Sequence, residues 1–530
     1  MEKTQVKTRY GYVRGTVKDG VRVWRGIPFA EPPVGDLRFR APQEPKSWEG
    51  VKEAVDAGPI AMQPVVKDTS RMSSQASGDV RSEDCLYLNI WAPGERAEAA
   101  EDARSAGKTD DREEAGCTNR AVDAEKISGP GERKPVMVWF HGGAFVSGAG
   151  SLSLYDGTSF VNGGEVVLVT VNYRLGPFGF LHLSPFGAGL GSNLGLLDQV
   201  AALRWVRENI AGFGGDPERV TIFGESAGAM SIAALLAMPS ATGLFRRAIL
   251  QSGAAQVMPP KDATKVAQAF LAELGAASSG MPAQGELAAW LGTFTADEIL
   301  DAGERLKAKL NKGGLSPMLF QPVLDGDTLP LDPVEAVRRG SAAGVELLIG
   351  TNRDEGAYFI RQGAPVLKRE ETVALLQQFG FNRPQELSEA YEVSNDGQAE
   401  LVTDLIFWGP AIRLAEAQLP HSKVWMYRFD WCLPGHPHPL ISKSVHALEI
   451  AFVFRNLFFL EAMGSSINAA VQGLAERMQR AWIRFATSES EKLADWEAYD
   501  LEQRETMVFN SEDGRLADPY AEKRLLLVRC

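Results

Sequence analysis

Val220-Thr-Ile-Phe-Gly-Glu-Ser-Ala-Gly-Ala-Met230 joins an apolar run to an alanine-rich run that continues to Met238, with the pattern Gly-x-Ser-x-Gly between them. The first run has the β-branched and aromatic residues of a buried strand, and the second has the composition of a core helix. A sharp strand-to-helix turn needs small residues on both sides of its central residue, here Ser226. The pattern predicts a strained turn that presents Ser226 as a nucleophile. The alternative is a serine that caps a core helix.

The alternation of strand and helix extends to both sides of this turn. Apolar runs at 135–140 and 166–171 each precede a glycine-rich turn, and residues 196–209 have a helical pattern. Further apolar runs are found at 220–223, 345–350 and 424–429. Strands that are apolar on both faces and alternate with helices indicate the α/β class, with a large, mostly parallel central sheet and helices on both faces.

Three other regions add to this frame. Alternating apolar and polar residues around Asp19-Gly20 predict a small amino-terminal β-hairpin or meander. Stretches 257–312 and 365–420 have Ala, Leu and Glu at helical spacing, and such insertions usually cap the carboxyl ends of the strands. Residues 95–134 carry 11 acidic and 8 basic side chains and no Leu, Met, Phe, Tyr or Trp. This predicts a charged surface insertion, with a specific docking element as the alternative.

The composition of the 530 residues is that of an ordinary globular protein, with 45% apolar and 23% charged residues. A formal charge of −13 argues against nucleic acid as a partner. The amino terminus has no apolar signal segment, and no apolar run reaches the roughly 18 residues of a membrane span, so we expect a cytoplasmic protein with no membrane partner. Four scattered cysteines without metal-site or redox spacing fit a reducing compartment.

A serine hydroxyl needs a base, a group that orients the base, and donors for the oxyanion before it can act as a nucleophile near neutral pH. Donors are expected in Trp139-Phe-His-Gly-Gly-Ala-Phe145, where small residues follow a predicted strand. There the backbone N–H groups of Gly143 and Ala144, together with that of Ala227, can approach a developing negative oxygen. A plain turn after an apolar strand is the alternative.

Six histidines are candidates for the base: His141, His182, His421, His436, His438 and His446. His141 and His182 precede the serine, whereas hydrolases with this turn have the chain order nucleophile, acid, base, and His141 belongs to the donor loop. His421 follows a proline in a polar stretch. His436 and His438 form with Cys432 a spacing that resembles a metal site, but three prolines and the lack of a fourth ligand favour a surface loop. His446 precedes an apolar block, where a histidine is commonly structural.

The acid is expected where the run at 345–350 ends in the polar turn Thr351-Asn-Arg-Asp-Glu-Gly356, because groups at the carboxyl end of a strand project from the sheet edge. Asp354 and Glu355 are both candidates. Either one can also be a solvated turn carboxylate, and periodicity does not separate them.

Motifs spread over nearly the whole chain resemble those of the type-B carboxylesterases, a family that includes cholinesterases, liver carboxylesterases and bacterial para-nitrobenzyl esterases. The stretches that carry the resemblance are Arg25-Gly-Ile-Pro-Phe-Ala30, Pro32-Pro-Val-Gly35, Ser82-Glu-Asp-Cys-Leu-Tyr-Leu-Asn89, the donor loop, Asn172-Tyr-Arg-Leu-Gly-Pro-Phe-Gly-Phe180, Asn193-Leu-Gly-Leu-Leu-Asp-Gln199, Phe213-Gly-Gly-Asp-Pro217, the serine turn, Asp354-Glu-Gly356 and His446-Ala-Leu-Glu449. The similarity is greatest to the bacterial para-nitrobenzyl esterases, notably at 175–184 and 425–431. So many motifs in one order make the resemblance specific.

The resemblance implies a single α/β-hydrolase domain over residues 1–530 and a serine carboxylesterase that needs no cofactor or metal. It also implies the triad Ser226, Glu355 and His446, with Glu225 tuning the local field. The implied substrate is a small-molecule carboxylic ester of short-chain, aryl or para-nitrobenzyl type, hydrolysed through an acyl-enzyme. The alternatives are an esterase specialised for a bulky aromatic ester, a polyester fragment or a toxin ester, and a related binding protein without catalysis.

Further expectations come from the same resemblance. Arg38 should pair with Glu83 and hold the amino-terminal segment. The disulfide that secreted relatives form at the position of Cys85 should be absent, because Ala61 stands at the partner position. Residues 60–84 contain no Phe, Tyr or Trp, which disfavours choline esters as substrates, because choline recognition uses a cation–π contact. A base with the pKa of an ordinary imidazole predicts loss of activity below about pH 6.5.

Overall fold

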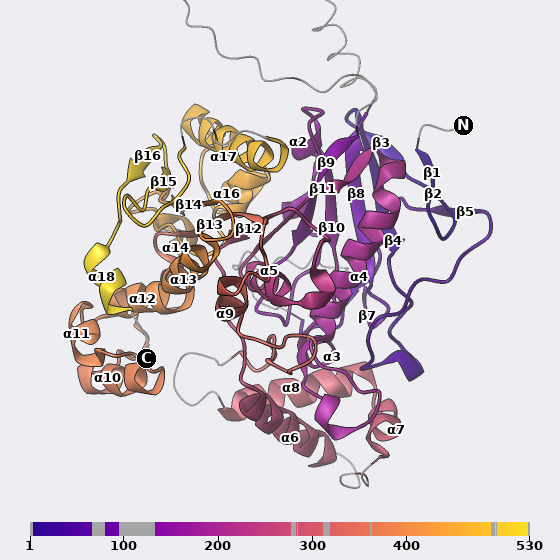
Figure 1. Cartoon of the computed structure of the whole chain (residues 1–530), viewed down its shortest axis with the longest axis horizontal. Coiled ribbons are helices and arrows are strands. Elements are labelled where there is room, and N and C mark those ends of the chain that lie inside the picture. Colours follow the sequence, from indigo (N-terminus) through magenta and orange to yellow (C-terminus); the bar gives the residue numbers. More distant parts are fainter. Residues whose placement is uncertain are drawn as a thin grey trace, which may run out of the picture.

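The computed structural model of the protein describes most of the chain (Figure 1). The described residues are 4–65, 80–94, 133–276, 282, 285–310, 318–360, 363–488, 493 and 496–527. The charged insertion expected at 95–134 lies outside the described residues up to position 132, and Lys134 already belongs to a strand. None of the described helices is both long and apolar enough to cross a bilayer.

A large mixed sheet forms the centre of the molecule. Its parallel strands are β9 (Lys134–Phe140), β10 (Val167–Val171), β11 (Gly215–Glu225), β12 (Arg247–Gln251), β13 (Glu346–Asn352), β14 (Val424–Phe429) and β15 (Thr506–Phe509). Antiparallel pairing adds β8 (Tyr87–Pro93), β4 (Val21–Pro28) and β3 (Thr16–Lys18) beyond β10, and β16 (Gly514–Leu516) beyond β15. The order across the sheet is β16-β15-β14-β13-β12-β11-β9-β10-β8-β4-β3. The mostly parallel α/β sheet expected from the sequence is confirmed, with antiparallel edges added to it.

The amino-terminal residues are divided between two sheets. Strands β3 and β4 form the expected hairpin at Asp19-Gly20 and lie at one edge of the large sheet. Strands β1 (Gln5–Lys7) and β2 (Tyr12–Arg14) pair with β5 (Val51–Glu53) in a separate sheet of three strands. The expected small meander is therefore two hairpins, of which one extends the central sheet.

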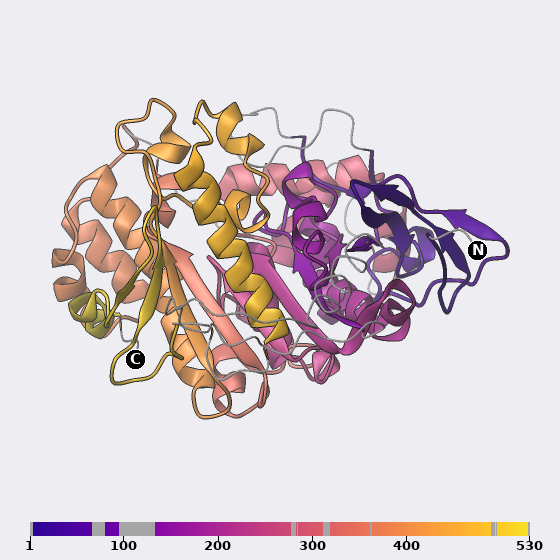
Figure 2. The same ribbon diagram turned by 90° about the horizontal axis from the view of Figure 1, so that it is seen from above.

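Each face of the sheet buries its own core. Val138 packs in one core with residues of α4 (Leu194–Asn209), α5 (Ala227–Ala237) and α13 (Gly409–Gln418). The next residue, Trp139, packs in the other core with residues of α2 (Thr158–Val161), α15 (Ile450–Val453) and α17 (Ala469–Thr487). Successive side chains of a strand point to opposite faces, so a strand covered by helices on both sides is apolar throughout. Figure 2 shows α17 lying across the strands on one of these faces.

The two long helical stretches differ in what they cover. In the first, α6 (Pro260–Ala276), α7 (Leu287–Gly292) and α8 (Ala296–Leu310) form a helical layer at the lower side of Figure 1, where α8 contacts α3 (Gly176–Phe180), the helix that follows β10. The second contains α10 (Arg369–Gln378), α11 (Pro384–Glu389), α12 (Asn395–Val402), the π-helix η7 (Thr403–Trp408) and α13. Helix α13 packs against β13 and β14 on a face of the sheet, whereas the sequence predicted a cap over the strand ends. Helical periodicity reveals the apolar side of a helix but not what that side covers.

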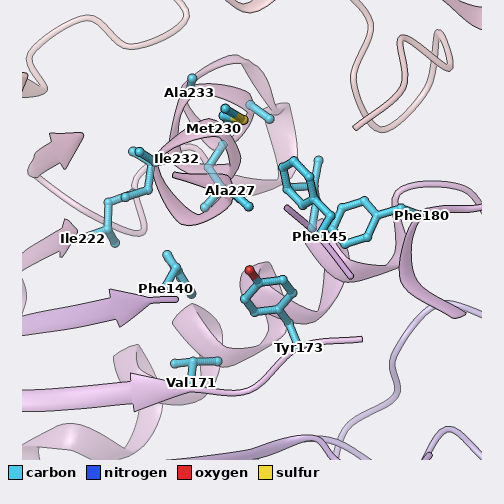
Figure 3. Close-up of a cluster of buried hydrophobic side chains, with 14 of the residues drawn as sticks. Phe140, Phe145, Val171, Tyr173, Phe180, Ile222, Ala227, Met230, Ile232 and Ala233 are labelled. Carbon is cyan, nitrogen blue, oxygen red and sulfur yellow. The ribbon is translucent and has the colours of Figure 1, made fainter. Parts of the chain in front are cut away.

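The core beneath α5 supports both the serine turn and the donor loop (Figure 3). Phe140 ends β9 and Phe145 ends the donor loop, and both side chains are fully buried. The rings of Phe145 and Phe180 lie 4.7 Å apart. The four residues between Phe140 and Phe145 are therefore anchored in the core at both ends, which fixes the backbone of the loop.

Candidate active site

Ser226 lies at the turn between β11 and α5 with φ 53° and ψ −119°, a conformation that is strained for a residue with a Cβ atom. The flanking glycines permit this turn to pass against the end of β9. A Cβ atom on Gly224 would lie 2.6 Å from the carbonyl oxygen of Phe140, and one on Gly228 would lie 2.0 Å from the same oxygen. The Ser226 hydroxyl makes no capping hydrogen bond to α5, so the alternative of a simple cap is wrong.

The structure brings Ser226, His446 and Glu355 into direct contact. Nε2 of His446 lies 2.9 Å from Oγ of Ser226, and Nδ1 lies 2.6 Å from Oε2 of Glu355. The other carboxylate oxygen of Glu355 accepts a hydrogen bond of 2.7 Å from the backbone N–H of Asn352. A carboxylate can only accept, so Nδ1 carries a proton, and in the neutral imidazole Nε2 is free to accept the serine proton.

Asp354, the other carboxylate of the polar turn, does not reach the imidazole. Its Oδ2 accepts a hydrogen bond of 3.0 Å from the backbone N–H of Ser444 and lies 3.0 Å from Nη2 of Arg353. Glu355 is fully buried at the start of the 3₁₀ helix η6 (Glu355–Tyr358). The backbone after β13 thus directs one carboxylate inward and the other to the neighbouring loop.

The other histidines contact groups outside this cluster. Nδ1 of His141 lies 2.8 Å from the carbonyl oxygen of the next residue, and burial lowers the pKa of His141 to about 4. Nδ1 of His182 lies 2.7 Å from a serine hydroxyl, and Nε2 of His421 lies 2.8 Å from a backbone carbonyl oxygen. His436 accepts a hydrogen bond of 3.1 Å from the backbone N–H of His438. No cluster of three potential metal ligands occurs within the described parts of the chain.

Glu225, the residue before Ser226, is a second buried carboxyl that faces the imidazole. Its Oε1 lies 3.1 Å from Nε2 of His446 but has no hydrogen bond of good geometry to any described residue. Burial raises the pKa of Glu225 well above its usual range, and the nearby carboxyls of Glu449 and Glu355 act in the same direction. The charge of His446 opposes this shift, so the titrations of Glu225 and of the imidazole are coupled.

The imidazole of His446 has a raised pKa in this environment. Burial by itself lowers the pKa of His446, but the carboxyls of Glu225 and Glu355 and the hydrogen bond to Glu355 outweigh burial and raise it to about 9. Burial and the charge of Glu355 also raise the pKa of Glu449 to about 7. This environment favours an acidic limit above the pH 6.5 expected for an ordinary imidazole.

The pH dependence of activity should report this shift. A base catalyst must be neutral, so kcat/KM rises with pH through the pKa of the free enzyme's imidazole. We expect the midpoint of the acidic limb above pH 6.5 and no higher than about 9. Glu225→Gln removes the carboxyl nearest Nε2 and should move the midpoint down. The measurement is kcat/KM from pH 5 to 10 for both enzymes, and an original midpoint at or below 6.5 would contradict the raised pKa.

The three expected oxyanion donors belong to segments next to Ser226: Ala227 follows it directly, and a Cβ atom on Gly142 would lie 3.1 Å from the Cβ atom of Ser226. Gly143 has φ 114° and Ala144 has φ 53°, so the backbone of the donor loop turns sharply at both residues. Ala227 is the first residue of α5, where the N–H has no partner within the helix. Among the described residues, no hydrogen bond uses the N–H of Gly143, Ala144 or Ala227. These three donors are free for a ligand.

A buried hydrogen-bond network behind Glu355 and His446 was not apparent in the sequence. The amide of Asn352 donates a hydrogen bond of 2.7 Å to the carbonyl oxygen of Val445 and one of 2.6 Å to Oε2 of Glu449. Oε1 of Glu449 accepts a hydrogen bond of 3.2 Å from Gln251. Glu449 does occur in a motif that resembles the family, and Asn352 is the last residue of β13, but only the fold shows that they join the turn of Glu355 to the loop of His446.

The structure also bears on two expectations about the amino-terminal part of the chain, an ion pair at Arg38 and an unpaired Cys85. Arg38 pairs with both carboxylate oxygens of Glu83, at 2.5 and 2.7 Å, which confirms the expected ion pair. Cys85 is a buried free thiol. Arg38 also donates to the carbonyl oxygens of Leu291 and Phe294, so this ion pair holds the loop after α7 as well as the amino-terminal segment.

Comparisons with known proteins agree with this geometry. Residues 2–527 match the model of the carboxylesterase family. The chain is 44% identical over 526 residues to the para-nitrobenzyl esterase of Bacillus subtilis (strain 168), covering 98% of this chain and 97% of that protein. It is 32% identical to the phenmedipham hydrolase of Pseudarthrobacter oxydans over 98% of both chains. A solved structure of a para-nitrobenzyl esterase, 43% identical, aligns with a TM-score of 0.86 over 99% of this chain and 100% of that chain. The chain belongs to the carboxylesterase family and is a serine hydrolase of carboxylic esters.

Proposed function

We propose that Ser226, His446 and Glu355 are the catalytic triad of this esterase. The observation that carries the proposal is the unbroken line of contacts from Oγ to Nε2, at 2.9 Å, and from Nδ1 to the buried carboxylate, at 2.6 Å. These contacts have the order that nucleophilic catalysis by serine requires: nucleophile, base and the group that orients the base.

The reaction then has two halves. His446 takes the proton of Ser226 as Oγ attacks the ester carbonyl, and the same proton passes from Nε2 to the alcohol oxygen as the C–O bond breaks. Water repeats the attack on the acyl-enzyme and releases the acid and the serine. Glu355 keeps the proton on Nδ1 and stabilises the imidazolium that forms in each half.

We also propose that the N–H groups of Gly143, Ala144 and Ala227 form the oxyanion hole. Their support is that they are unbonded within the described residues and that two of them lie on a loop anchored in the core at both ends. Donors that are already oriented stabilise the charge of the tetrahedral intermediate without reorganisation, and each one typically contributes about 2.7–4 kcal/mol.

Aryl and para-nitrobenzyl esters are the substrates that we propose. The support is the 44% identity to a para-nitrobenzyl esterase and the aromatic surrounding of the base. The ring centroids of Phe407 and Phe359 lie 4.7 and 5.2 Å from that of His446, and Phe359 is 43% exposed. An exposed aromatic face next to the reacting atoms favours a flat aromatic group in the substrate.

The test combines trapping with a substrate panel. A 4-nitrophenyl alkylphosphonate should form one adduct, located on Ser226 by peptide mass spectrometry, and activity should fall in step with its formation. An adduct on another residue, or a modified enzyme that remains active, would refute the triad. In the panel, kcat/KM should be higher for 4-nitrobenzyl and phenyl acetate than for ethyl acetate. Equal values would refute the aryl preference alone.

Glu355→Gln should lower kcat by about 10⁴, whereas Asp354→Asn should change it by less than about fivefold. The Gln oxygen would keep the hydrogen bond that Glu355 accepts from Asn352, and this turns its amide N–H toward Nδ1 of His446. The imidazole then carries its proton on Nε2 and cannot accept from the serine. Steady-state kinetics of both variants measures this, and a larger loss for Asp354→Asn would reverse the assignment of the acid.

We further propose a cytoplasmic location. The support is that Cys85 and Cys432, the two cysteines that the structure describes, are both free thiols, as is usual in a reducing compartment. Fractionation of the native cells tests this, and activity released with the periplasmic or extracellular fraction would contradict it.

A further inference from the structure

The segment directly after the donor loop is tied to residues far away in the sequence by one fully buried carboxamide. Oε1 of Gln63 accepts a hydrogen bond of 2.8 Å from the N–H of Gly148, and Nε2 donates to the carbonyl oxygen of Gly148 at 3.0 Å. Nε2 also donates to the carbonyl oxygen of Ala61 at 3.0 Å. Gln63 thus binds both polar backbone groups of Gly148, as a neighbouring strand would, and both of its own donors are used.

A second buried carboxamide acts two residues further on. Oδ1 of Asn172 accepts a hydrogen bond of 2.8 Å from the N–H of Gly150, and Nδ2 donates to the carbonyl oxygen of Pro59 at 3.2 Å. Residues 59–63 and residues 148–150, which follow the donor loop, are therefore joined through side chains. Arg81 donates a hydrogen bond of 2.8 Å to the backbone carbonyl oxygen of Gln63 and so also holds this segment.

Gly148 lies directly against the start of the donor loop. It has φ 109°, and a Cβ atom there would lie 2.5 Å from Nδ1 of His141 and 2.6 Å from the carbonyl oxygen of Gly142. The N–H of the preceding residue, Ser147, donates a hydrogen bond of 3.1 Å to the carbonyl oxygen of Gly143. A shift of Gly148 would therefore move the backbone that carries the expected oxyanion donors.

We infer that Gln63 is a positioning residue for the oxyanion hole: by binding both backbone groups of Gly148, it holds the N–H groups of Gly143 and Ala144 where the oxyanion forms. The inference rests on the proposed function, because it requires those N–H groups to be the donors. Gln63 itself touches no reacting atom. A carboxamide offers a donor and an acceptor on one plane without having to take up a proton, whereas an ionised Glu can only accept and Met offers neither group.

The effect should appear in the chemical step and not in substrate binding. Oxyanion donors bind the tetrahedral intermediate more strongly than the ground-state carbonyl, so misplaced donors lower kcat and leave KM nearly unchanged. A displacement of about 1 Å can reduce the rate by on the order of 100-fold. A side chain that only contributes to folding would lower the melting temperature without this separation of kcat from KM.

The experiment compares Gln63→Met with a matched control, Gln418→Met. Gln418 is also fully buried and donates to two carbonyl oxygens, those of Ala342 and Val345, but it lies at the amino end of β13, opposite to the end that Glu355 follows. The measurements are kcat and KM for 4-nitrophenyl acetate, inhibition by an aryl trifluoromethyl ketone, which forms a tetrahedral adduct, and the melting temperature.

We expect Gln63→Met to lower kcat by roughly 10- to 100-fold with KM within about threefold. Inhibition by the ketone should weaken by the same factor as kcat/KM. Gln418→Met should have a lower melting temperature but a kcat within about twofold of the original. A kcat of Gln63→Met equal to that of the control, or a rise in KM alone, would overturn the inference. If Gln63→Met does not fold, Gln63→Asn decides, because its amide is one methylene too short to bind Gly148. An unchanged kcat would then overturn the inference.

Failure of this inference can be told from failure of the proposed function. If Gln63→Met is fully active and Ser226→Ala is inactive, only the role of Gln63 is refuted. If Ser226→Ala retains activity, the triad itself is refuted, whatever Gln63→Met does.

Discussion

Ser226→Ala should lower kcat for 4-nitrophenyl acetate by on the order of a millionfold, about 8 kcal/mol of transition-state stabilisation. Without Oγ no acyl-enzyme can form, and His446 has no hydroxyl from which to take a proton. The residual rate should come from ester bound near the free N–H donors and attacked directly by water. The fold should persist, because the strained turn is set by the glycines on either side and alanine is smaller than serine.

The measurement is initial-rate kinetics on purified enzyme, with Ser231→Ala as the control. Ser231 lies on the same helix, α5, and its hydroxyl accepts a hydrogen bond of 3.1 Å from Gln199. Its loss should lower stability by about 1 kcal/mol and leave kcat within about twofold. Turnover by Ser226→Ala above about one per cent of the original would show that another group is the nucleophile.

His446→Gln should lower kcat almost as much as Ser226→Ala. Glutamine approximates the reach of the imidazole and can still hydrogen bond to the serine and to Glu355, but it cannot take up a proton and return it to the leaving alcohol. In a comparable triad, losing the base costs about as much as losing the whole triad. The double variant Ser226→Ala, His446→Gln should therefore be no slower than either single variant.

The control is His421→Gln, since the side chain of His421 hydrogen bonds to the backbone carbonyl of Arg338, outside the cluster of Ser226, His446 and Glu355, and an amide can keep that contact. Kinetics of the three variants and the control, measured on one substrate, supplies the comparison. If the double variant were slower than the single variants by the product of their effects, Ser226 and His446 would act independently, and the triad would be contradicted.

Local features of the sequence were sufficient for the class of fold and for the serine turn. Strands such as β9 and β14 are short apolar runs because both faces of the sheet are covered, and this pattern is visible without any structure. The turn at Ser226 is equally local, because the clashes that Gly224 and Gly228 avoid lie at the end of one neighbouring strand. Strand β12 is absent from the prediction, since only three apolar residues lie between Arg247 and Gln251.

The choice among carboxylates and histidines depended on tertiary structure. His446 is 91 residues from Glu355 and 220 residues from Ser226, and no periodicity relates positions so far apart. Asp354 and Glu355 are adjacent and chemically alike, yet one binds a loop backbone and the other the imidazole. The resemblance to a family implied Glu355 as the acid. The physical reason why Glu355 and not Asp354 reaches the imidazole is the direction in which the backbone turns after β13.

The resemblance gave Glu225 a role in the local field, whereas nothing in the sequence marked Gln63. The contacts that support either role come only from burial against one partner, the imidazole of His446 or the peptide groups of Gly148. Patterns of apolar residues specify which surfaces are covered, because burial of apolar area is non-directional. Hydrogen bonds and charge interactions depend on distance and angle, and those are set only when distant segments pack together.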